Sequence, residues 1–328
     1  MFQRDLPVKP DDLRVAAVVV TFNRLEQLRQ TVARLLTEQI EHLIGVDHGS
    51  ADGTGAWLAQ AADPRMTVIT SAQNCGGAGG FEIGMRAAVA EFDPDWLVLM
   101  DDDARPEPGV IAQFRGMDHQ GFDGVAAAVY TLDGGICDMN RPSVNPFWHP
   151  AAFLQTLMGQ GRSGFHLKDQ DYQATGAQAI DAASFVGLFL SRAGIRAAGF
   201  PDGRLFIYGD DVLYTLAMRR AGCKLAFVPD LRFEHDFTTF EAGSIVFRPL
   251  WKAYYHHRNL LFVYRSAAGV LFWPVLLLVL PKWLLKGGKY GADRPGFMRL
   301  LRLAIRDGLV GRRNRAHAEI LAVEAKSD

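Results

Sequence analysis

The chain has 328 residues, 49% of them apolar and 22% charged, which is enough for one large or two modest domains around a substantial core. Its formal net charge of −1 conceals an asymmetry: residues 251–328 carry 14 Lys and Arg against 5 Asp and Glu, and the first 250 carry 21 against 31. A basic tail on an acidic body predicts contact with an anionic surface, and the apolar stretch within that tail favours a membrane over nucleic acid.

The cysteines and the N-terminal segment indicate the compartment. Cys75, Cys137 and Cys223 have no metal-binding spacing, and such a scattered set is typical of a reducing cytosol. Residues 1–14 are polar, so we expect neither a secretory signal nor an anchor there.

The first part of the chain alternates strands and helices. We expect strands at 15–22, 42–47, 66–70 and 96–100, with helices at 25–36, after Thr54, and after the glycines at 76–80 to about Phe92. Short connections between such elements predict an α/β fold with a doubly wound, mostly parallel sheet. Ligands of such sheets bind beyond the carboxyl ends of the strands, where Asp47, Asn74 and the acids at 101–103 lie.

Three carboxylates follow the apolar strand at 96–100. Side chains alternate along a strand, so Asp101 and Asp103 should point one way and Asp102 the other. Neighbouring carboxylates repel each other, and a divalent cation would make this arrangement tolerable at neutral pH. A loop that merely begins with acids is the alternative for an isolated triplet.

A glycine-rich run, Asn74-Cys-Gly-Gly-Ala-Gly-Gly-Phe81, precedes a helix. Glycine lets backbone amides approach a ligand, and a helix N-terminus attracts a diphosphate. A plain tight turn is the alternative, because the run is neither a Walker loop nor a dinucleotide-binding fingerprint.

Beyond residue 120 the pattern is less regular. We expect strands at 125–131, 183–191 and 224–229, a helix at 210–221, and a long irregular stretch at 133–175 of the functional or mobile kind. Asp210 and Asp211 open the helix, where N-capping is the alternative to a catalytic role. His235 follows a strand end, where a structural histidine is the alternative to a metal ligand.

Residues 267–285 are almost entirely apolar, but Lys282 and two prolines leave fewer clean residues than the roughly 20 that a crossing helix needs. Trp273, Trp283 and the lysines at 282, 286 and 289 are typical interfacial anchors. We expect a helix pair in or on the bilayer face. A buried packing or dimer helix and a true span are the alternatives.

Together these segments resemble the family 2 glycosyltransferases with the GT-A fold, over residues 15–262. The segments that match family motifs are Val18–Arg24 (nucleotide-binding loop), Val46–Thr54 with His48 where Asn is usual, Asp101–Asp103 (metal-binding acids), Tyr208–Val212 (catalytic acid) and His235 (metal-ligating position). Tyr254–Leu260 is similar to a Tyr-x-x-Arg-Asn segment of rhamnosyl- and galactofuranosyltransferases, and Asn74–Phe81 to a run of bacterial galactofuranosyltransferases. Leu213 and Ala217 depart from the family pattern.

The resemblance implies a catalytic domain at 1–262, with a nucleotide-binding half at 14–120 and an acceptor half at 121–262, followed by a basic, apolar helical tail at 263–328. It implies an inverting, metal-dependent transfer of a sugar from a nucleotide diphosphate to a carbohydrate or lipid-linked glycan in cell-surface polysaccharide synthesis. UDP-galactofuranose is the first expectation for the donor, and dTDP-rhamnose is the alternative. The chain would act at the cytoplasmic face of the bacterial inner membrane, without nucleic acid, and a homo-oligomer stays open.

The resemblance also assigns residues. Asp211 would be the catalytic base, and Asp101, Asp103 and His235 would hold Mn²⁺ or Mg²⁺. The residues expected to bind the donor are Thr21, Asn23, Arg24, Asp47, Asn74, Gly76, Gly77, Gly79, Gly80, Asp101 and Asp102. A nucleotidyltransferase is disfavoured because the loop after the first strand has no glycine, and a non-catalytic scaffold because every expected carboxylate and the histidine are present.

Overall fold

The computed structural model describes residues 12–61, 63–119, 121–236 and 246–325, so most of the polar N-terminal segment lies outside it. Within these residues one sheet has the strand order β3-β2-β1-β4-β8-β6-β9-β5, with β7 paired to β9. The strands are β1 (Val15–Thr21), β2 (His42–Asp47), β3 (Met66–Thr70), β4 (Trp96–Asp101), β5 (Ala104–Pro106), β6 (Gly124–Thr131), β7 (Gln178–Ile180), β8 (Leu188–Ser191) and β9 (Leu225–His235).

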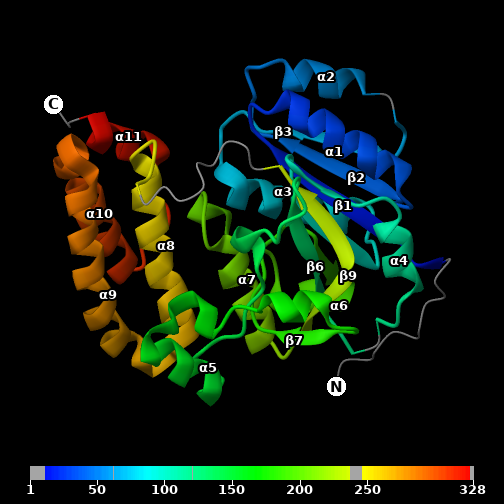
Figure 1. Ribbon diagram of the computed structural model, residues 1–328. Coiled ribbons are helices and arrows are strands. Elements are labelled where there is room, and N and C mark those ends of the chain that lie inside the picture. Colours follow the sequence, from blue (N-terminus) through cyan, green and yellow to red (C-terminus); the bar gives the residue numbers. More distant parts are fainter. Residues whose placement is uncertain (1–11, 62, 120, 237–245, 326–328) are drawn as a thin grey trace.

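Helices cover both faces of this sheet, and a further helical layer stands beside it (Figure 1). The helices are α1 (Leu25–Thr37), α2 (Thr54–Gln60), α3 (Gly76–Glu91), α4 (Val110–Gly116), α5 (Pro150–Gln155), α6 (Arg192–Ala198), α7 (Asp210–Arg220), α8 (Trp251–Ala268), α9 (Phe272–Lys286), α10 (Arg294–Leu309) and α11 (His317–Ala325). This arrangement confirms the predicted α/β class.

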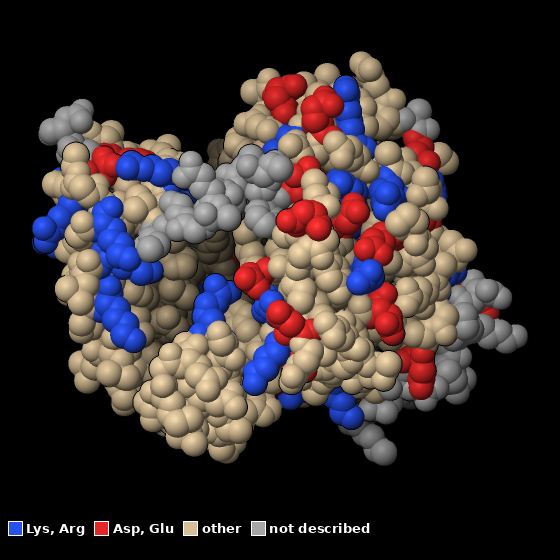
Figure 2. All heavy atoms as spheres, viewed as in Figure 1, with Lys and Arg blue, Asp and Glu red and all other residues tan. Residues whose placement is uncertain are grey.

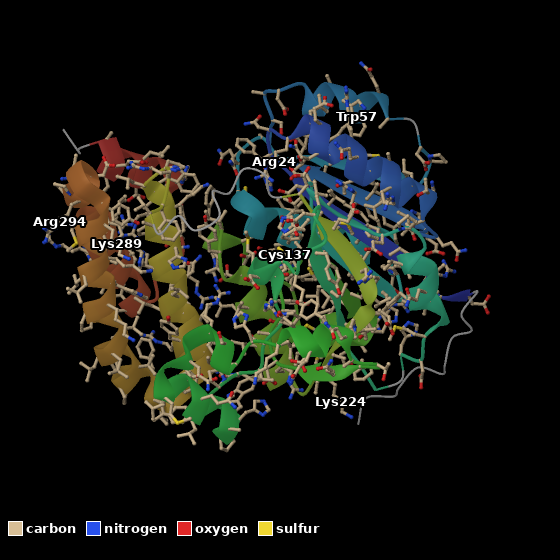
Figure 3. All side chains as sticks on the ribbon, in the orientation of Figure 1. Arg24, Trp57, Cys137, Lys224, Lys289 and Arg294 are labelled. Atoms are coloured by element: carbon tan, nitrogen blue, oxygen red, sulfur yellow. The ribbon has the colours of Figure 1, made fainter. Side chains whose placement is uncertain are left out.

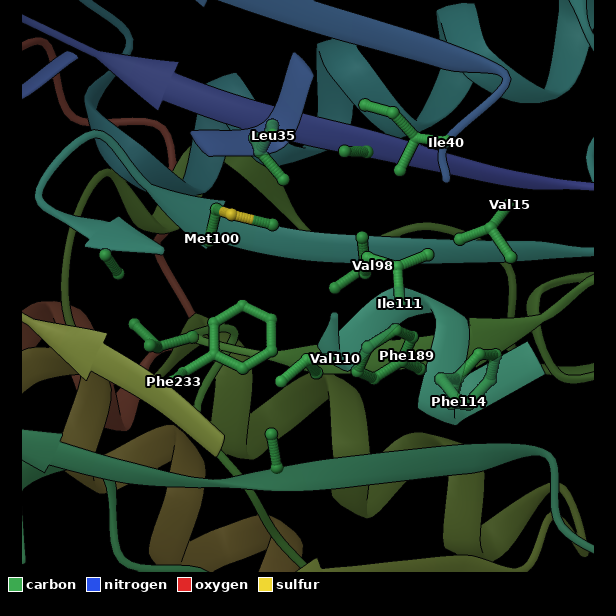
Figure 4. Packing of buried hydrophobic residues seen from close by; sticks show 14 of the residues in the cluster. Val15, Leu35, Ile40, Val98, Met100, Val110, Ile111, Phe114, Phe189 and Phe233 are labelled. Carbon is green, nitrogen blue, oxygen red and sulfur yellow. The ribbon is translucent and has the colours of Figure 1, made fainter. Parts of the chain in front are cut away.

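The sheet is buried on both faces because β1 and β4 have no polar side. Val15 and Val98 pack into one core cluster with Leu35 and Phe114 from α1 and α4, as Figure 4 shows. Val18 lies on the opposite face of β1 and belongs to a second core cluster, which includes residues of α3 and α7. Continuous apolar runs therefore mark central strands covered by helices on both sides.

The strand register brings the predicted ligand-binding ends to one edge. Strands β1, β2, β3 and β4 are parallel, with Thr21 paired to Asp47 and Val20 paired to Asp101. The carboxyl ends that the sequence marks with polar residues are thus neighbours in space.

Three elements have a boundary that differs by several residues from the predicted one. β9 continues through Pro229 to His235, because a break in its register with β6 accommodates the proline. α3 begins at Gly76 and so includes the glycine run that we expected to precede it. The strand predicted at 183–191 is limited to β8, Leu188–Ser191.

The C-terminal helices form a third apolar cluster, which joins α8, α9, α10 and α11. The stretch 251–309 is long and apolar enough to cross a membrane by length and composition, but turns at Gly269 and Gly291 divide it into α8, α9 and α10. These helices pack side by side (Figure 1). The domain boundary predicted at 262 falls inside α8.

Candidate functional site

The acidic triplet lies at the end of β4, but its three side chains have different surroundings. The strand ends at Asp101, and a turn at Asp102 and Asp103 leads into β5. Asp102 is buried and accepts a hydrogen bond from Oγ1 of Thr21 at 2.7 Å. Its main-chain oxygen accepts another from Oγ1 of Thr31 at 2.8 Å. Asp102 therefore helps to bind the loop to the sheet.

His235 lies beside Asp103, although 132 positions separate the two in sequence numbering, because β9 pairs with β5. The pairing sets His235 opposite Ala104, and its Nε2 lies 3.2 Å from Oδ1 of Asp103. On the other side of the ring, Nδ1 lies 2.7 Å from Oδ1 of Asn140. Nδ2 of Asn140 donates to Oγ of Ser184 at 2.9 Å, which sets the amide so that its oxygen faces the imidazole.

Asn140 is a functional candidate that sequence reasoning missed. A histidine that ligates a metal typically donates its second ring N–H to an oxygen, which fixes the ring and leaves the other nitrogen free. Asn140 supplies such an oxygen for His235. It comes from the irregular stretch at 133–175, where no motif separates it from ordinary loop residues.

The charges of this cluster shift its titration. Burial raises the pKa of Asp101 to about 6, and the nearby charge of Asp103 adds to this. Burial opposes ionisation of Asp103 as well, but the His235 imidazole and the Arg24 guanidinium outweigh it and lower the Asp103 pKa. Burial also disfavours the charged form of His235, yet its contact with the Asp103 carboxylate prevails and raises the pKa of His235 to about 10.

Arg24, labelled in Figure 3, reaches from the loop after β1 to the same acids. Its guanidinium forms an ion pair with Asp103 and lies 3.6 Å from Oδ1 of Asp102. Arg24 and His235 thus compensate the carboxylates that the strand end collects.

The side chains of Asp101, Asp103 and His235 are of the chemical types that bind hard divalent cations. Asp101 and Asp103 offer carboxylate oxygens, and His235 offers an imidazole held from behind. Oδ1 of Asp103 is buried and, among the described residues, has no well-aligned hydrogen-bond donor, so it is an acceptor that a cation would satisfy. Among all residues that the structure describes, no group of three or more Asp, Glu, His or Cys side chains is already arranged to hold a metal ion. The ligand types fit, whereas the closed coordination geometry is not preformed.

Asp210 and Asp211 open α7, but neither occupies the capping position. Gly209, with φ of 74°, is the N-cap residue, so the N-capping alternative does not account for the pair. Burial raises the pKa of Asp211 to about 6. Burial, followed by the charge of Asp211, holds the pKa of Asp210 well above its usual range. The charge of Asp211 also contributes to the raised pKa of Asp101, so the base candidate and the strand-end acids share one electrostatic environment.

On the predicted nucleotide side, the loops after β1 and β2 hold each other. Oδ1 of Asp47 accepts hydrogen bonds from N and Oγ of Ser50, at 3.1 and 2.6 Å. Oδ1 of Asn23 accepts one from N of Ala51 at 2.7 Å. Asn23 and Asp47 therefore shape the rim where the sequence predicts the nucleotide.

The start of α3 is built on a close approach. Oδ1 of Asn74 accepts a hydrogen bond from N of Gly76 at 2.8 Å. Gly76 has φ of +69°, and a Cβ there would lie 2.1 Å from O of Phe206. Only glycine fits this position, for conformational and steric reasons together.

The remaining glycines of the run differ in what surrounds them. A Cβ on Gly80 would lie 2.4 Å from Val20 and 2.5 Å from His48, and one on Gly79 would lie 2.4 Å from Cys75. A Cβ on Gly77 would meet no atom within 4 Å. Gly80 thus lets α3 pack closely on β1, and Gly77 is the glycine of the run with open space where a side chain would stand.

The chain resembles known proteins in sequence and in structure. Residues 16–169 match the model of glycosyl transferase family 2. The galactofuranosyltransferase GlfT1 of Mycolicibacterium smegmatis is 29% identical over 311 residues, which cover 92% of this chain and 97% of that protein.

Two solved structures show the same fold. A mannosyltransferase from Pyrobaculum calidifontis, in complex with GDP-mannose and Mn²⁺, superposes with a TM-score of 0.51 at 15% identity, covering 98% of this chain and 81% of that one. A fragment of S. aureus TarS with UDP-GlcNAc gives 0.53 at 12% identity, covering 96% and 91%. At these identities the likeness shows the fold alone, and it agrees with the sheet described above.

Proposed function

Because this chain is a glycosyltransferase that carries a family 2 domain and resembles galactofuranosyltransferases, we propose that it transfers galactofuranose from UDP to a glycan hydroxyl with inversion. The acceptor is a carbohydrate or a lipid-linked glycan, and dTDP-rhamnose is the alternative donor. The observation that supports this function best is that Asp103 and His235 are in contact, while the charges of Asp103 and Asp211 both contribute to the raised pKa of the buried Asp101. Four residues from three distant segments thus form one acidic site at the ligand-binding edge of the sheet.

In this proposal Asp211 is the base. With a pKa of about 6 it is mostly ionised at neutral pH and would accept the proton of the attacking hydroxyl. The acceptor oxygen bonds to the anomeric carbon as the bond to the diphosphate breaks, and the bonding pair leaves with the diphosphate. A single displacement of this kind inverts the anomeric carbon.

Asp101, Asp103 and His235 would hold Mn²⁺ or Mg²⁺, which when bound supplies positive charge for the departing diphosphate. The mannosyltransferase of similar fold contains Mn²⁺ together with its nucleotide sugar, which supports this choice. Asp47 is the proposed hydrogen-bond partner of the nucleotide's base ring. The main-chain amide of Gly77, which has open space beside it, is the part of the glycine run best able to approach the diphosphate.

The test of the base is Asp211→Asn in a transfer assay with UDP-galactofuranose, with dTDP-rhamnose run in parallel. General-base assistance contributes about 10²–10⁴-fold, so turnover should fall by that factor while the dissociation constant of UDP with Mn²⁺ stays close to that of the wild type. Asp210→Asn is the matched control, because it makes the same change at the neighbouring buried carboxyl at the start of the same helix. Wild-type turnover in Asp211→Asn would reject the assignment, and transfer from dTDP-rhamnose alone would change the donor.

We also propose that the enzyme docks on the cytoplasmic leaflet of the bacterial inner membrane. Large apolar side chains are exposed on α9 and on the tip formed by α5 and the following turn η3 (Thr156–Gln160). They are Phe153, Leu154, Leu157 and Met158 on the tip, and Val270, Leu271, Trp273, Leu277, Leu278, Leu284 and Leu285 around α9. These are 11 of the 17 exposed large apolar residues in the described chain, so the two segments form the main apolar surface.

The charges beside this surface favour an anionic membrane as its partner. Figure 2 shows Lys and Arg spread over the helical layer, with an uncharged surface over α5. The exposed cations of α9 and α10 include Lys282, Arg302 and Arg306. The acids of this stretch, Asp293 and Asp307, are half-buried or buried and form ion pairs with arginines, so they do not offset the exposed cations.

A further inference from the structure

The segment 203–209, which leads directly into Asp210 and Asp211, has an unusual backbone. Phe206 and Tyr208 have φ of 71° and 68°, in the left-handed region that side chains other than glycine rarely adopt. Such conformations persist where the surrounding structure holds them, and they are frequent at functional sites.

Asn259 of α8 holds this segment through its side-chain amide. Nδ2 donates to the main-chain oxygens of Leu205, Ile207 and Tyr208, at 3.1, 2.8 and 2.8 Å. Asn259 is 1% exposed, so water does not compete for these bonds. A single amide group therefore satisfies three main-chain oxygens of the segment.

Arg258 fixes the orientation of that amide. Its Nε donates to Oδ1 of Asn259 at 2.8 Å, which turns Nδ2 toward the segment, and its Nη2 donates to O of Leu205 at 2.8 Å. Nη1 donates to O of Arg313, 3.2 Å away in the stretch after α10. The side chain is fully buried, and its guanidinium lies 5.2 and 5.0 Å from the rings of Tyr254 and Tyr255. Arg258 thus connects the segment to the C-terminal helices.

The opposite side of the same segment contacts α3. O of Phe206 accepts a hydrogen bond from N of Ala78 at 3.1 Å, and N of Gly203 donates to Oε2 of Glu82 at 2.9 Å. The segment therefore lies between the helix proposed to meet the donor diphosphate and the residue proposed as base.

We propose that Arg258 and Asn259 are positioning residues of the transfer reaction, which hold the backbone of 205–208 so that Asp211 faces the donor bound at α3. They act through this backbone and touch neither substrate. The inference rests on the proposed function, because it requires Asp211 to be the base.

The test compares Asn259→Ala with Leu261→Ala, a truncation of another fully buried residue on the same helix, which contacts Gly308 of α10. A misplaced reacting group costs about 100-fold, so Asn259→Ala should lower kcat by that order. The dissociation constant of UDP with Mn²⁺ should change less than about threefold, because α3 packs on β1 independently of Asn259. Leu261→Ala should lower the melting temperature at least as much, with kcat within about threefold of the wild type.

Arg258→Lys gives a second measurement if Asn259→Ala does not fold. It keeps the charge but loses the fork that serves two acceptors at once, so kcat should again fall while UDP binding persists. Loss of kcat in proportion to the melting temperature in all variants, or unchanged kcat in Asn259→Ala, would overturn the inference. No transfer by the wild type from either donor would instead reject the proposed function.

Discussion

Individual side chains in this site are positioned by neighbours that carry no chemistry themselves. His235 faces Asp103 because Asn140 holds the far side of its ring, and Asn140 is held by Ser184. Burial is the largest cause that acts on the pKa of Asp211, and it raises this pKa to about 6. The reactivity of each group therefore depends on how its surroundings pack.

Replacement of Asn140 by Ala should weaken Mn²⁺ binding about 10–100-fold, because outer partners of a ligating histidine typically contribute that much to metal affinity. A Mn²⁺ titration followed by electron paramagnetic resonance measures this without requiring turnover. Asn140→Asp is the matched variant, since it keeps an oxygen for Nδ1 of His235 and should retain most of the affinity. Equal Mn²⁺ affinity in wild type and Asn140→Ala would argue against His235 as a ligand.

The pH dependence of transfer should follow Asp211. Its protonated form cannot accept a proton, so the rate is low below a pKa of about 6 and rises to a plateau above it. A profile of kcat between pH 5 and pH 8 covers about one unit or more on each side of that pKa. It would therefore show the rise of kcat as Asp211 loses its proton, which is the acidic limb of the profile. Asp210→Asn should leave the limb in place, and a flat profile would contradict the role of Asp211.

At the scale of elements, the glycines of α3 serve two purposes: some allow close packing against neighbouring segments, and one leaves space beside the helix N-terminus. Gly76 and Gly80 allow contact with Phe206 and Val20, whereas Gly77 faces open space. The helix is consequently fixed to the sheet and to the segment before α7, while Gly77 in its first turn stays partly exposed.

Gly80→Ala and Gly77→Ala should therefore fail in different ways. Gly80→Ala forces a methyl group against Val20 and should destabilise the fold by about 1–3 kcal/mol, seen as a lower melting temperature. Gly77→Ala should leave the melting temperature close to that of the wild type but weaken UDP binding, because its methyl group would stand where the diphosphate approaches. Unchanged UDP affinity in Gly77→Ala would remove Gly77 from the donor site.

At the scale of the whole molecule, the apolar tip and the region around α9 carry 11 of the 17 exposed large apolar side chains of the described residues. α9 has 15 residues, a length of about 22 Å, which is shorter than the roughly 30 Å core of a bilayer. We therefore expect the helical layer to lie on or dip into one leaflet rather than cross it.

Vesicle flotation tests this surface. Full burial of a Leu side chain contributes about 1.5–3 kcal/mol, so Leu277→Ser with Leu278→Ser should release the protein from phosphatidylglycerol vesicles, and Leu157→Ser should weaken binding less. Leu132→Ser, at a 52% exposed position of the catalytic body, is the control that should float like the wild type. If the α9 variant still floats fully, or if the wild type forms dimers that this variant lacks, the surface is a protein interface instead.

These point substitutions are preferable to deletion of the predicted tail at 263–328. That deletion would cut inside α8 and remove the carbonyl of Arg313 that Arg258 binds. It would therefore disturb the segment before Asp211 as well as the apolar surface, and the two effects would be confounded.

The sequence alone determined much of the sheet, because the polarity of each short segment indicates whether it is buried. Runs with no polar side, such as 15–20 and 96–100, are typical of central strands of a parallel sheet, and polar residues that follow them are expected at the ligand-binding edge. The acids at 101–103 and Asp47 were identifiable for this reason, whereas the role of Asp211 at a helix start was what the resemblance to family 2 glycosyltransferases implied. The resemblance to galactofuranosyltransferases was equally readable, and the comparison with GlfT1 confirms it.

Only the tertiary structure decided which of these residues meet. The pairing of β9 with β5 brings His235 to Asp103, and it depends on a break in register at Pro229 that no local pattern reveals. Asn140 and Asn259 acquire their roles in the same way, through hydrogen bonds to residues far along the chain. Sequence periodicity records what each residue's own segment requires, whereas these contacts arise from packing between segments, which a local pattern does not encode.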